Sequence, residues 1–247
     1  MSEKVAKGDF VEIEYEAFAN GKLFDTNIPE KLKEINPNAK AEKTIVRVGK
    51  EMVIEGLDKR LEGKDVGKEY EVEIPPSEAF GTRDRALIKT IPLALFKQHN
   101  LSPRAGMTLT IDGMPARVVA VSGARVTIDL NNPLAGKDIT YKIKIKRKLS
   151  DEKEIVSAVL LYLFRKPLEF ELSGEKVIVK GEKPLSYFVE ALKPRFKEIV
   201  GKELSFSESG QEKSGLESKD SGEETDSQSE KDDKTSGTGQ EQNQSSA

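Results

Sequence analysis

The 247-residue chain contains no cysteine, no tryptophan and only one histidine, His99. The absence of cysteine excludes disulfide bonds and thiolate nucleophiles, and a single histidine excludes most histidine-rich metal sites. No stretch approaches the ~18 apolar residues that a transmembrane helix needs, and the N-terminal sequence has no apolar signal-peptide core. We therefore expect a cytoplasmic protein with no metal, no cofactor and no membrane partner.

Apolar residues are scarce, because only 36% of the chain is hydrophobic while 34% is charged. The charge is unevenly spread: residues 207–247 hold eleven acidic residues, four lysines and one large apolar residue. Such a segment cannot bury enough surface to offset the entropy lost on ordering, so it is predicted to be a disordered acidic tail. The other 206 residues are mildly basic, with 36 basic and 32 acidic side chains, which is too little charge to predict nucleic-acid binding.

The most specific pattern lies between residues 48 and 81. Apolar residues at helical spacing predict a short helix with one apolar stripe, formed by Val53, Ile54, Leu57 and Leu61. The alternation in KEYEVEI predicts a half-buried strand, which Pro75 and Pro76 end because proline cannot donate to a sheet. The stretch contains no nucleophile, metal ligand or phosphate-binding loop. What it offers is apolar surface at an exposed turn.

The segment VIEGLDKRLEGKDVGKEYEVEIPPSEAFG closely resembles the central signature of FKBP-type peptidyl-prolyl cis-trans isomerases. The shared features are VI-x-G, the glycines at 63 and 67, I-P-P and A-[YF]-G, spread over about thirty positions. The resemblance implies an α+β fold in which an antiparallel sheet wraps around a short helix. It assigns residues 1–83 and 132–149 to one discontinuous FKBP domain.

An alternating segment, FVEIEYEAF, precedes a predicted hairpin turn at Asn20-Gly21 and a returning strand. By the resemblance, Tyr15, Phe24 and Asp25 on this hairpin match the pocket tyrosine, phenylalanine and aspartate of the family. The alternative is that Tyr15 and Phe24 are ordinary sheet core and that Asp25 is a turn residue.

After Gly81, about fifty residues intervene before NNPLAGKDITYKIKI, which is similar to the last FKBP segment. Residues 84–131 predict a strand, a short helix and three further alternating strands. This pattern resembles the insert-in-flap domain of SlyD-like and archaeal FKBPs, and it adds an inserted, mostly β domain to the α+β fold. In NNPLAG, Asn132 replaces the usual histidine of that subfamily, and Tyr141 falls where an aromatic residue walls the pocket.

Residues 150–206 predict a small C-terminal α+β domain without a recognisable motif. Asp151 and Glu154 are spaced as in a helix capping box, and a second helix over 185–200 is expected to bend or break near Pro194. The basic residues of this domain are interpreted as a solvated face rather than a nucleic-acid site: Lys193, Arg195, Lys197 and Lys202. The domain and the acidic tail could tether the protein to a ribosome or to another chaperone, and the sequence does not choose between them.

The resemblance implies prolyl isomerisation without an acid, a base or a metal. Rotation about an X-Pro bond opposes amide resonance, with a barrier of ~18–20 kcal/mol, and a dry apolar pocket favours the less polar twisted state. The expected pocket residues are Tyr15, Phe24, Asp25, Val53, Ile54, Leu57, Phe80 and Tyr141. The Ile54 N–H would bind a substrate carbonyl, and Asp25 would polarise the site. Leu57 takes the place of the tryptophan of the smallest FKBPs.

The insert holds more apolar residues than a domain of about fifty residues hides easily. We expect an open groove that binds unfolded chains and raises their effective concentration at the pocket. The candidate binding residues are Ile88, Ile91, Leu93, Leu95, Phe96, Met107, Met114 and Val118. The alternative is that all of them form the core of the insert.

These patterns favour a peptidyl-prolyl isomerase that accelerates folding, with unfolded or nascent polypeptides containing X-Pro bonds as its partners. A second hypothesis is a non-catalytic holdase on an FKBP scaffold, which Asn132 and Leu57 support. An enzyme of another class, such as a phosphatase or a nuclease, is disfavoured because the chain lacks a glycine-rich phosphate loop, a histidine cluster and a paired-carboxylate site.

Overall fold

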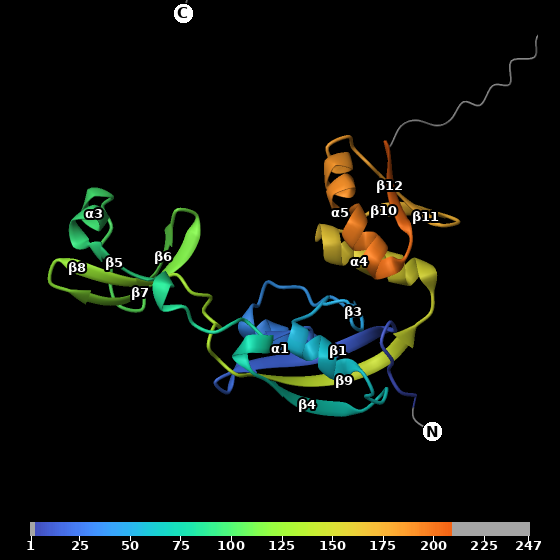
Figure 1. The fold of residues 1–247 in the computed structure, drawn as a ribbon, viewed down its shortest axis with the longest axis horizontal. Helices are drawn as coiled ribbons and strands as arrows, with labels where there is room; N and C mark the ends of the chain where they lie inside the picture. Colours follow the sequence, from blue (N-terminus) through green and yellow to red (C-terminus); the bar gives the residue numbers. More distant parts are fainter. Residues whose placement is uncertain (1–2, 209–247) are drawn as a thin grey trace, which may run out of the picture. The chain divides into compact units, whose positions relative to one another are not determined.

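The first sheet combines strands from both predicted segments of the FKBP domain (Figure 1). The structure is a computed structural model that describes residues 3–208. The strands of this sheet are β1 (Phe10–Ala19), β2 (Lys22–Thr26), β3 (Thr44–Arg47), β4 (Glu69–Ile74) and β9 (Ile139–Leu149). β9 lies between β1 and β4, and β1 also pairs with β3 along its first half and with β2 along its second half, always antiparallel.

The β1–β2 hairpin follows from its local sequence. Asn20 and Gly21 both have positive φ, 52° and 73°, as a two-residue type I′ turn requires. The apolar alternation of β1 supplies fully buried core residues, namely Val11, Ile13 and Ala17. After the hairpin, the short helix α1 (Pro29–Ile35) begins with proline and buries no residue.

Helix α2 (Glu55–Leu61) packs against β4 through a glycine. A Cβ added at Gly56 would overlap the Ile74 Cγ2 methyl and would lie 3.0 Å from the carbonyl oxygen of Glu78. The glycine in the VI-x-G pattern is therefore required by close packing of the helix on the strand and on the 3-10 turn η1 (Pro76–Glu78) that follows it.

The predicted apolar stripe of this helix is partly correct. Leu57 and Leu61 lie in α2 and are buried. The prediction is wrong for Val53 and Ile54, because the helix begins at Glu55 and both residues precede it, half-buried. They therefore belong to a loop that leads into the helix.

A second sheet has a core of its own. Its strands, in spatial order, are β5 (Ile88–Pro92), β8 (Arg125–Asp129), β7 (Met114–Ser122) and β6 (Thr108–Ile111), with the 3-10 turn η2 (Arg85–Leu87) and helix α3 (Leu93–Gln98) beside them. The core residues are Phe96, Leu109, Ala116, Val118, Val126 and Ile128. The chain enters and leaves at one place, because the Asp84 N–H donates to Asn131 Oδ1 and Asn131 Nδ2 donates to the Asp84 carbonyl, each at 2.9 Å.

The third sheet belongs to the C-terminal segment. It holds β10 (Glu169–Ser173), β11 (Lys176–Gly181) and β12 (Glu203–Glu208), with helices α4 (Glu152–Phe164) and α5 (Leu185–Val200). The Asp151 carboxylate caps α4 by accepting the Glu154 N–H at 2.7 Å. α5 runs through Pro194, so the predicted break is wrong. Full burial of Phe196 and Ile199 beyond the proline offsets the ~3 kcal/mol that proline costs inside a helix.

The boundary of the acidic tail also needs correction. β12 pairs in parallel with β11 as far as Glu208, so Ser207 and Glu208 are strand residues rather than the start of a disordered tail. The rest of the predicted tail lies outside the described residues. The α+β fold class is confirmed, whereas the division of the chain into domains stays a prediction.

We expect Gly56→Ala to destabilise the protein by about 1–3 kcal/mol, because the added methyl overpacks the contact between α2 and β4. Urea unfolding followed by circular dichroism measures the change. Gly181→Ala is the matched control, since Gly181 also has no positive φ and its added Cβ would meet only the Leu185 side chain. Equal destabilisation by the two substitutions would contradict the packing argument.

Candidate active site

Four of the predicted pocket residues form two aromatic pairs. The ring centroids of Tyr15 and Tyr141 lie 5.9 Å apart with the planes tilted by 50°. Phe24 and Phe80 meet edge to face, with centroids 6.1 Å apart and planes at 76°. Both arrangements fall in the preferred range for aromatic pairs. The first follows from strand register, because β1 and β9 make Tyr15 and Tyr141 diagonal neighbours.

Asp25 links these pairs through the β1–β2 hairpin. The Tyr15 hydroxyl donates to Asp25 Oδ2 at 3.0 Å, and Asp25 follows Phe24 directly in β2. We call the set Tyr15, Phe24, Asp25, Phe80 and Tyr141 the aromatic site.

Both tyrosine hydroxyls of the aromatic site stay protonated at neutral pH. Burial is the largest cause that raises the pKa of Tyr15, and the negative charge of Asp25 and the hydrogen bond to it add to the effect. Burial, followed by the charge of Asp25, raises the pKa of Tyr141 to about 12. The site therefore combines aromatic rings and one carboxylate with two tyrosine hydroxyls that are not poised for proton transfer near pH 7.

The loop before α2 presents Val53 and Ile54. Both side chains are half-buried and pack against the same core as Tyr15, Phe24 and Phe80. The buried Asp58 holds this loop, because its two carboxylate oxygens accept the backbone N–H groups of Gly49 and Glu51, each at 2.9 Å. Within the part of the chain that the structure describes, the Ile54 N–H donates to no other group.

Two of the predicted pocket residues are buried, Leu57 at 1% and Tyr141 at 6% exposed. Leu57 lies in the core beneath the loop and offers almost no surface to a ligand.

The loop after β4 carries Phe80 and is held by the same helix. Arg60 Nη1 donates to Glu78 Oε2 at 2.7 Å and to the Gly56 carbonyl at 2.7 Å. Lys59 lies 3.6 Å from the other carboxylate oxygen of Glu78. α2 thus holds both the loop that precedes it and the loop that follows β4.

Asn27 supports Tyr15 at the gap between β2 and β3, which pair with different halves of β1. Its side-chain oxygen accepts the Tyr15 N–H at 2.9 Å, and its Nδ2 donates to the Ile13 carbonyl at 2.7 Å and to Thr44 Oγ1 at 3.0 Å. The side chain therefore replaces a missing strand partner. The sequence analysis missed Asn27, Asp58 and Glu78. Only Asp58 carried a local signal, as an acidic residue directly beside the buried Leu57.

Asn132, which stands where histidine was expected, has a local structural role. Its Oδ1 accepts the Leu134 N–H at 2.8 Å, and its carbonyl accepts the Ala135 N–H at 2.9 Å. These bonds shape the turn that leads toward β9.

The second sheet exposes several of the predicted client-binding side chains, where clients are unfolded protein substrates. Met114, Leu95, Met107 and Ile88 are 52, 47, 41 and 38% exposed. A groove of about 510 Å³ lies beside α3, and its lining includes Ile91, Leu95, Leu101 and Ile111. We call these side chains and this groove the insert surface. Leu93 is half-buried.

Two of the predicted client-binding residues lie in the core of the second sheet. Val118 is fully buried and does not line the groove, so the prediction that it contacts clients directly is wrong and the alternative of a core role holds for it. Phe96 is 5% exposed in the same core but also lines the groove, so its contact with clients stays a prediction.

Residues 3–208 show no group of three or more histidine, aspartate or glutamate side chains placed to hold a metal ion. No helix in this range is long and apolar enough to cross a membrane.

Two protein-family models match the chain. A model described as FKBP-type peptidyl-prolyl cis-trans isomerase matches residues 1–97. A model described as the FKBP26 IF domain matches residues 89–134. The two matches together cover most of the first two sheets.

Curated relatives agree with these matches. A short-type peptidyl-prolyl cis-trans isomerase of Methanocaldococcus jannaschii is 36% identical over 149 residues, which are 59% of this chain and 95% of the relative. The FKBP-type isomerase SlyD of Aeromonas hydrophila is 31% identical over 146 residues, 58% of this chain and 64% of SlyD. SlyD of Haemophilus influenzae is 27% identical over 100 residues, 39% of this chain and 53% of the relative. The chain thus spans less than two thirds of these SlyD proteins.

We expect the folded protein to lose stability as the pH rises from about 10 toward 12. The ordinary pKa of tyrosine is 10.0 and burial raises the pKa of Tyr141 to about 12, so the unfolded chain ionises first and stability is lost across this window. The loss attributable to Tyr141 is on the order of 2 kcal/mol. Urea unfolding at a series of pH values measures it.

The variant Tyr141→Phe should flatten the alkaline part of this stability curve. Tyr187→Phe is the matched control, because it also removes one hydroxyl but from a side chain that is 75% exposed. An alkaline slope that is the same in both variants would show that Tyr141 does not cause the loss.

Proposed function

The chain belongs to the FKBP-type peptidyl-prolyl cis-trans isomerases, and from this premise we propose that it rotates X-Pro bonds at the aromatic site and captures clients on the insert surface. The first part is supported by the two aromatic pairs, by the hydrogen bond from Tyr15 to Asp25, and by the Ile54 N–H, which has no partner within residues 3–208. The second part is supported by the exposed large apolar side chains of the insert and by a groove that Leu95 and Leu101 line.

The aromatic site suits a reaction that needs no proton transfer. An X-Pro bond rotates over a barrier of ~18–20 kcal/mol, because twisting destroys amide resonance. The twisted imide is less polar than the planar one, so an apolar surface that excludes water stabilises it relative to the ground state. The rings of Tyr15, Phe24, Phe80 and Tyr141 supply such a surface.

Two polar groups orient the substrate in this proposal. The Ile54 N–H, which has no partner in the described structure, donates to a carbonyl of the bound peptide. Asp25 accepts the Tyr15 hydroxyl at 3.0 Å, so it fixes the ring of Tyr15 and places one negative charge beside the reacting bond. Because burial keeps the tyrosine protonated, this hydrogen bond persists at neutral pH.

The insert surface supplies client capture. Single exposed apolar residues are common on any protein, but several gathered around a groove indicate a binding surface. Exposed methionine suits varied clients, because its flexible side chain adapts to different partners. A chain held here reaches the aromatic site at a raised effective concentration. The proposed cellular setting is the cytoplasm, with unfolded or nascent polypeptides as partners.

We expect Asp25→Ala to lower kcat/KM for a proline-containing peptide by about tenfold to a hundredfold. A hydrogen bond to a charged group contributes about 1.5–3 kcal/mol, and 1.4 kcal/mol corresponds to a factor of ten. Phe80→Ala should act in the same direction by opening the apolar surface. A protease-coupled or NMR exchange assay measures the rate, and circular dichroism checks folding. Unchanged kcat/KM in both folded variants would show that the aromatic site does not take part in catalysis.

We expect the double variant Leu95→Ser, Met114→Ser to leave peptide isomerisation unchanged while slowing proline-limited refolding of an unfolded client by about tenfold or more. Both side chains are about half exposed, so the fold should tolerate the change. Tyr187→Ser removes a more exposed aromatic side chain, 75% exposed, outside the insert and is the control. Equal refolding rates in wild type and double variant would contradict capture by the insert.

The same refolding assay distinguishes an isomerase from the alternative of a non-catalytic holdase. If the wild-type protein suppresses client aggregation but accelerates neither peptide nor protein isomerisation, the chain is a holdase on an FKBP scaffold. Acceleration of both by the wild type excludes that alternative.

A further inference from the structure

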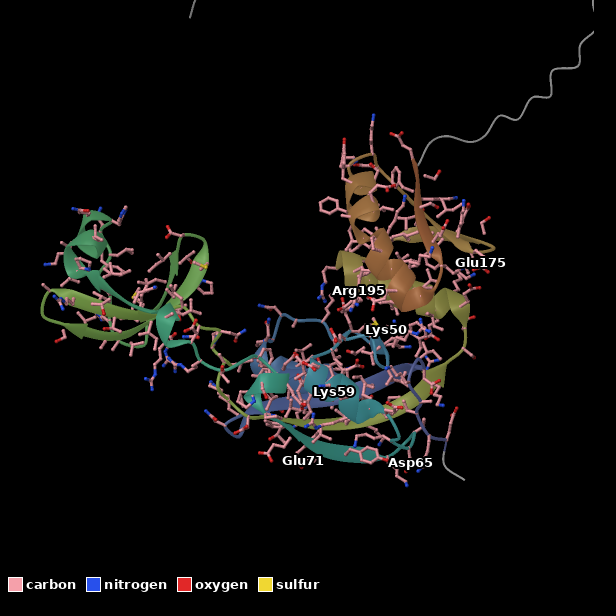
Figure 2. The ribbon with its side chains drawn as sticks, viewed as in Figure 1. Lys50, Lys59, Asp65, Glu71, Glu175 and Arg195 are labelled. Atoms are coloured by element: carbon pink, nitrogen blue, oxygen red, sulfur yellow. The ribbon has the colours of Figure 1, made fainter. Side chains whose placement is uncertain are left out.

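The C-terminal helix α5 contacts the loop that presents Val53 and Ile54. Arg195 Nη2 donates to the Lys50 carbonyl at 2.6 Å and to the Glu51 carbonyl at 3.3 Å. Figure 2 labels Lys50 and Arg195, which lie side by side where this helix meets the loop. The interpretation of Arg195 as part of a solvated basic face is therefore wrong, since its side chain is only 32% exposed and bonds to residues 145 and 144 positions away.

We propose that Arg195 is a positioning residue of the isomerase, which holds the loop of residues 49–54 so that Val53 and the Ile54 N–H are in place beside the aromatic site. This inference rests on the proposed function of that site. It gives the C-terminal segment a role in catalysis although it contributes no residue to the aromatic site.

The loop needs restraint because its backbone is unusual. Glu51 has φ of +50°, a conformation that residues with a side chain rarely adopt without support. Asp58 satisfies the N–H groups of Gly49 and Glu51, and Arg195 satisfies the carbonyls of Lys50 and Glu51. Donors and acceptors of the same short loop are thus held by two different helices, and Ile54 follows three residues later.

Arg195 is itself held in one orientation. Its Nη1 donates to Glu198 Oε2 at 2.7 Å, and the other oxygen of Glu198 lies 3.6 Å from Lys50 Nζ. A further bond runs the opposite way, from Arg47 Nη1 to the Ile199 carbonyl at 2.5 Å. The contact between α5 and this region therefore does not depend on Arg195 alone, which allows its substitution without detaching the helix.

The geometry favours arginine over lysine. A guanidinium can donate to Glu198 with one nitrogen and to two carbonyls with the other, whereas the single ammonium of lysine cannot reach both sides with the same geometry. The other basic residues of the predicted face bond within their own segment, Lys193 to Glu190, Lys197 to Glu203 and Lys202 to the Gly174 carbonyl. Within residues 3–208, none of these three lysines bonds to the loop, so they serve as controls.

The test uses the full chain with Arg195→Ala, Arg195→Lys and the control Lys197→Ala. We expect Arg195→Ala to lower kcat/KM for a proline-containing peptide by about tenfold, because a displaced binding group misaligns the substrate. The loss should fall mainly on kcat, Arg195→Lys should recover part of it, and Lys197→Ala should match wild type. Unfolding midpoints close to wild type show that the fold is retained.

A second measurement does not depend on activity. Backbone amide hydrogen exchange should become faster at residues 49–54 in Arg195→Ala and stay unchanged at Leu57 and Leu61 in α2. Wild-type kcat/KM together with wild-type exchange in the loop would overturn the inference while leaving the proposed function standing. Faster loop exchange in Arg195→Ala, together with a wild-type protein that shows no isomerase activity, would instead support the restraint and overturn the proposed function.

Discussion

Strand β9 pairs with β1 along one edge and with β4 along the other, and the arrangement of the site depends on that register. The pairing runs from Phe10 opposite Leu149 to Ala19 opposite Ile139, so it joins residues more than a hundred positions apart. It places Tyr141 between Ala17 and Val72, diagonal to Tyr15. Because side chains alternate between faces, a shift by one residue would turn Tyr141 away from Tyr15. The reciprocal bonds of Asp84 and Asn131 keep the intervening insert compatible with this register, because they bring its two ends together.

The seven-residue helix α2 organises the two loops beside the aromatic site. α2 is too short to be stable alone in water, so its form depends on burial of Leu57 and Leu61 and on the close approach at Gly56. In return it holds the loop before it through Asp58 and the loop after β4 through Arg60. Charged side chains thus fix the two loops, while aromatic side chains form the surface of the proposed site.

The sequence predicted what is encoded by neighbouring residues. The Asn20-Gly21 turn, the Asp151 cap and the alternating strands each follow from a pattern a few residues long, and each is present in the structure. The aromatic residues of the site were named through a family signature, and the structure brings Tyr15 to Tyr141 and Phe24 to Phe80.

The predictions failed where burial, or a partner far away in the sequence, determines the role of a residue. Val118 looks like a surface candidate in an alternating strand, but it is fully buried in the core of the second sheet. Pro194 signals a break, yet the buried residues after it keep the helix together. The bond from Arg195 to Lys50 spans 145 positions and has no local pattern at either end. Asn27 is similar, because its role depends on a gap between two strands rather than on its own neighbours.

The central position of β9 also sets an order for synthesis. A ribosome completes the second sheet, with its own enclosed core, before residues 139–149 exist. The first sheet can close only afterwards, when β9 enters between β1 and β4. During translation the insert surface is therefore complete before the aromatic site, and β1 and β4 must wait, each with an unpaired edge, for the strand that joins them.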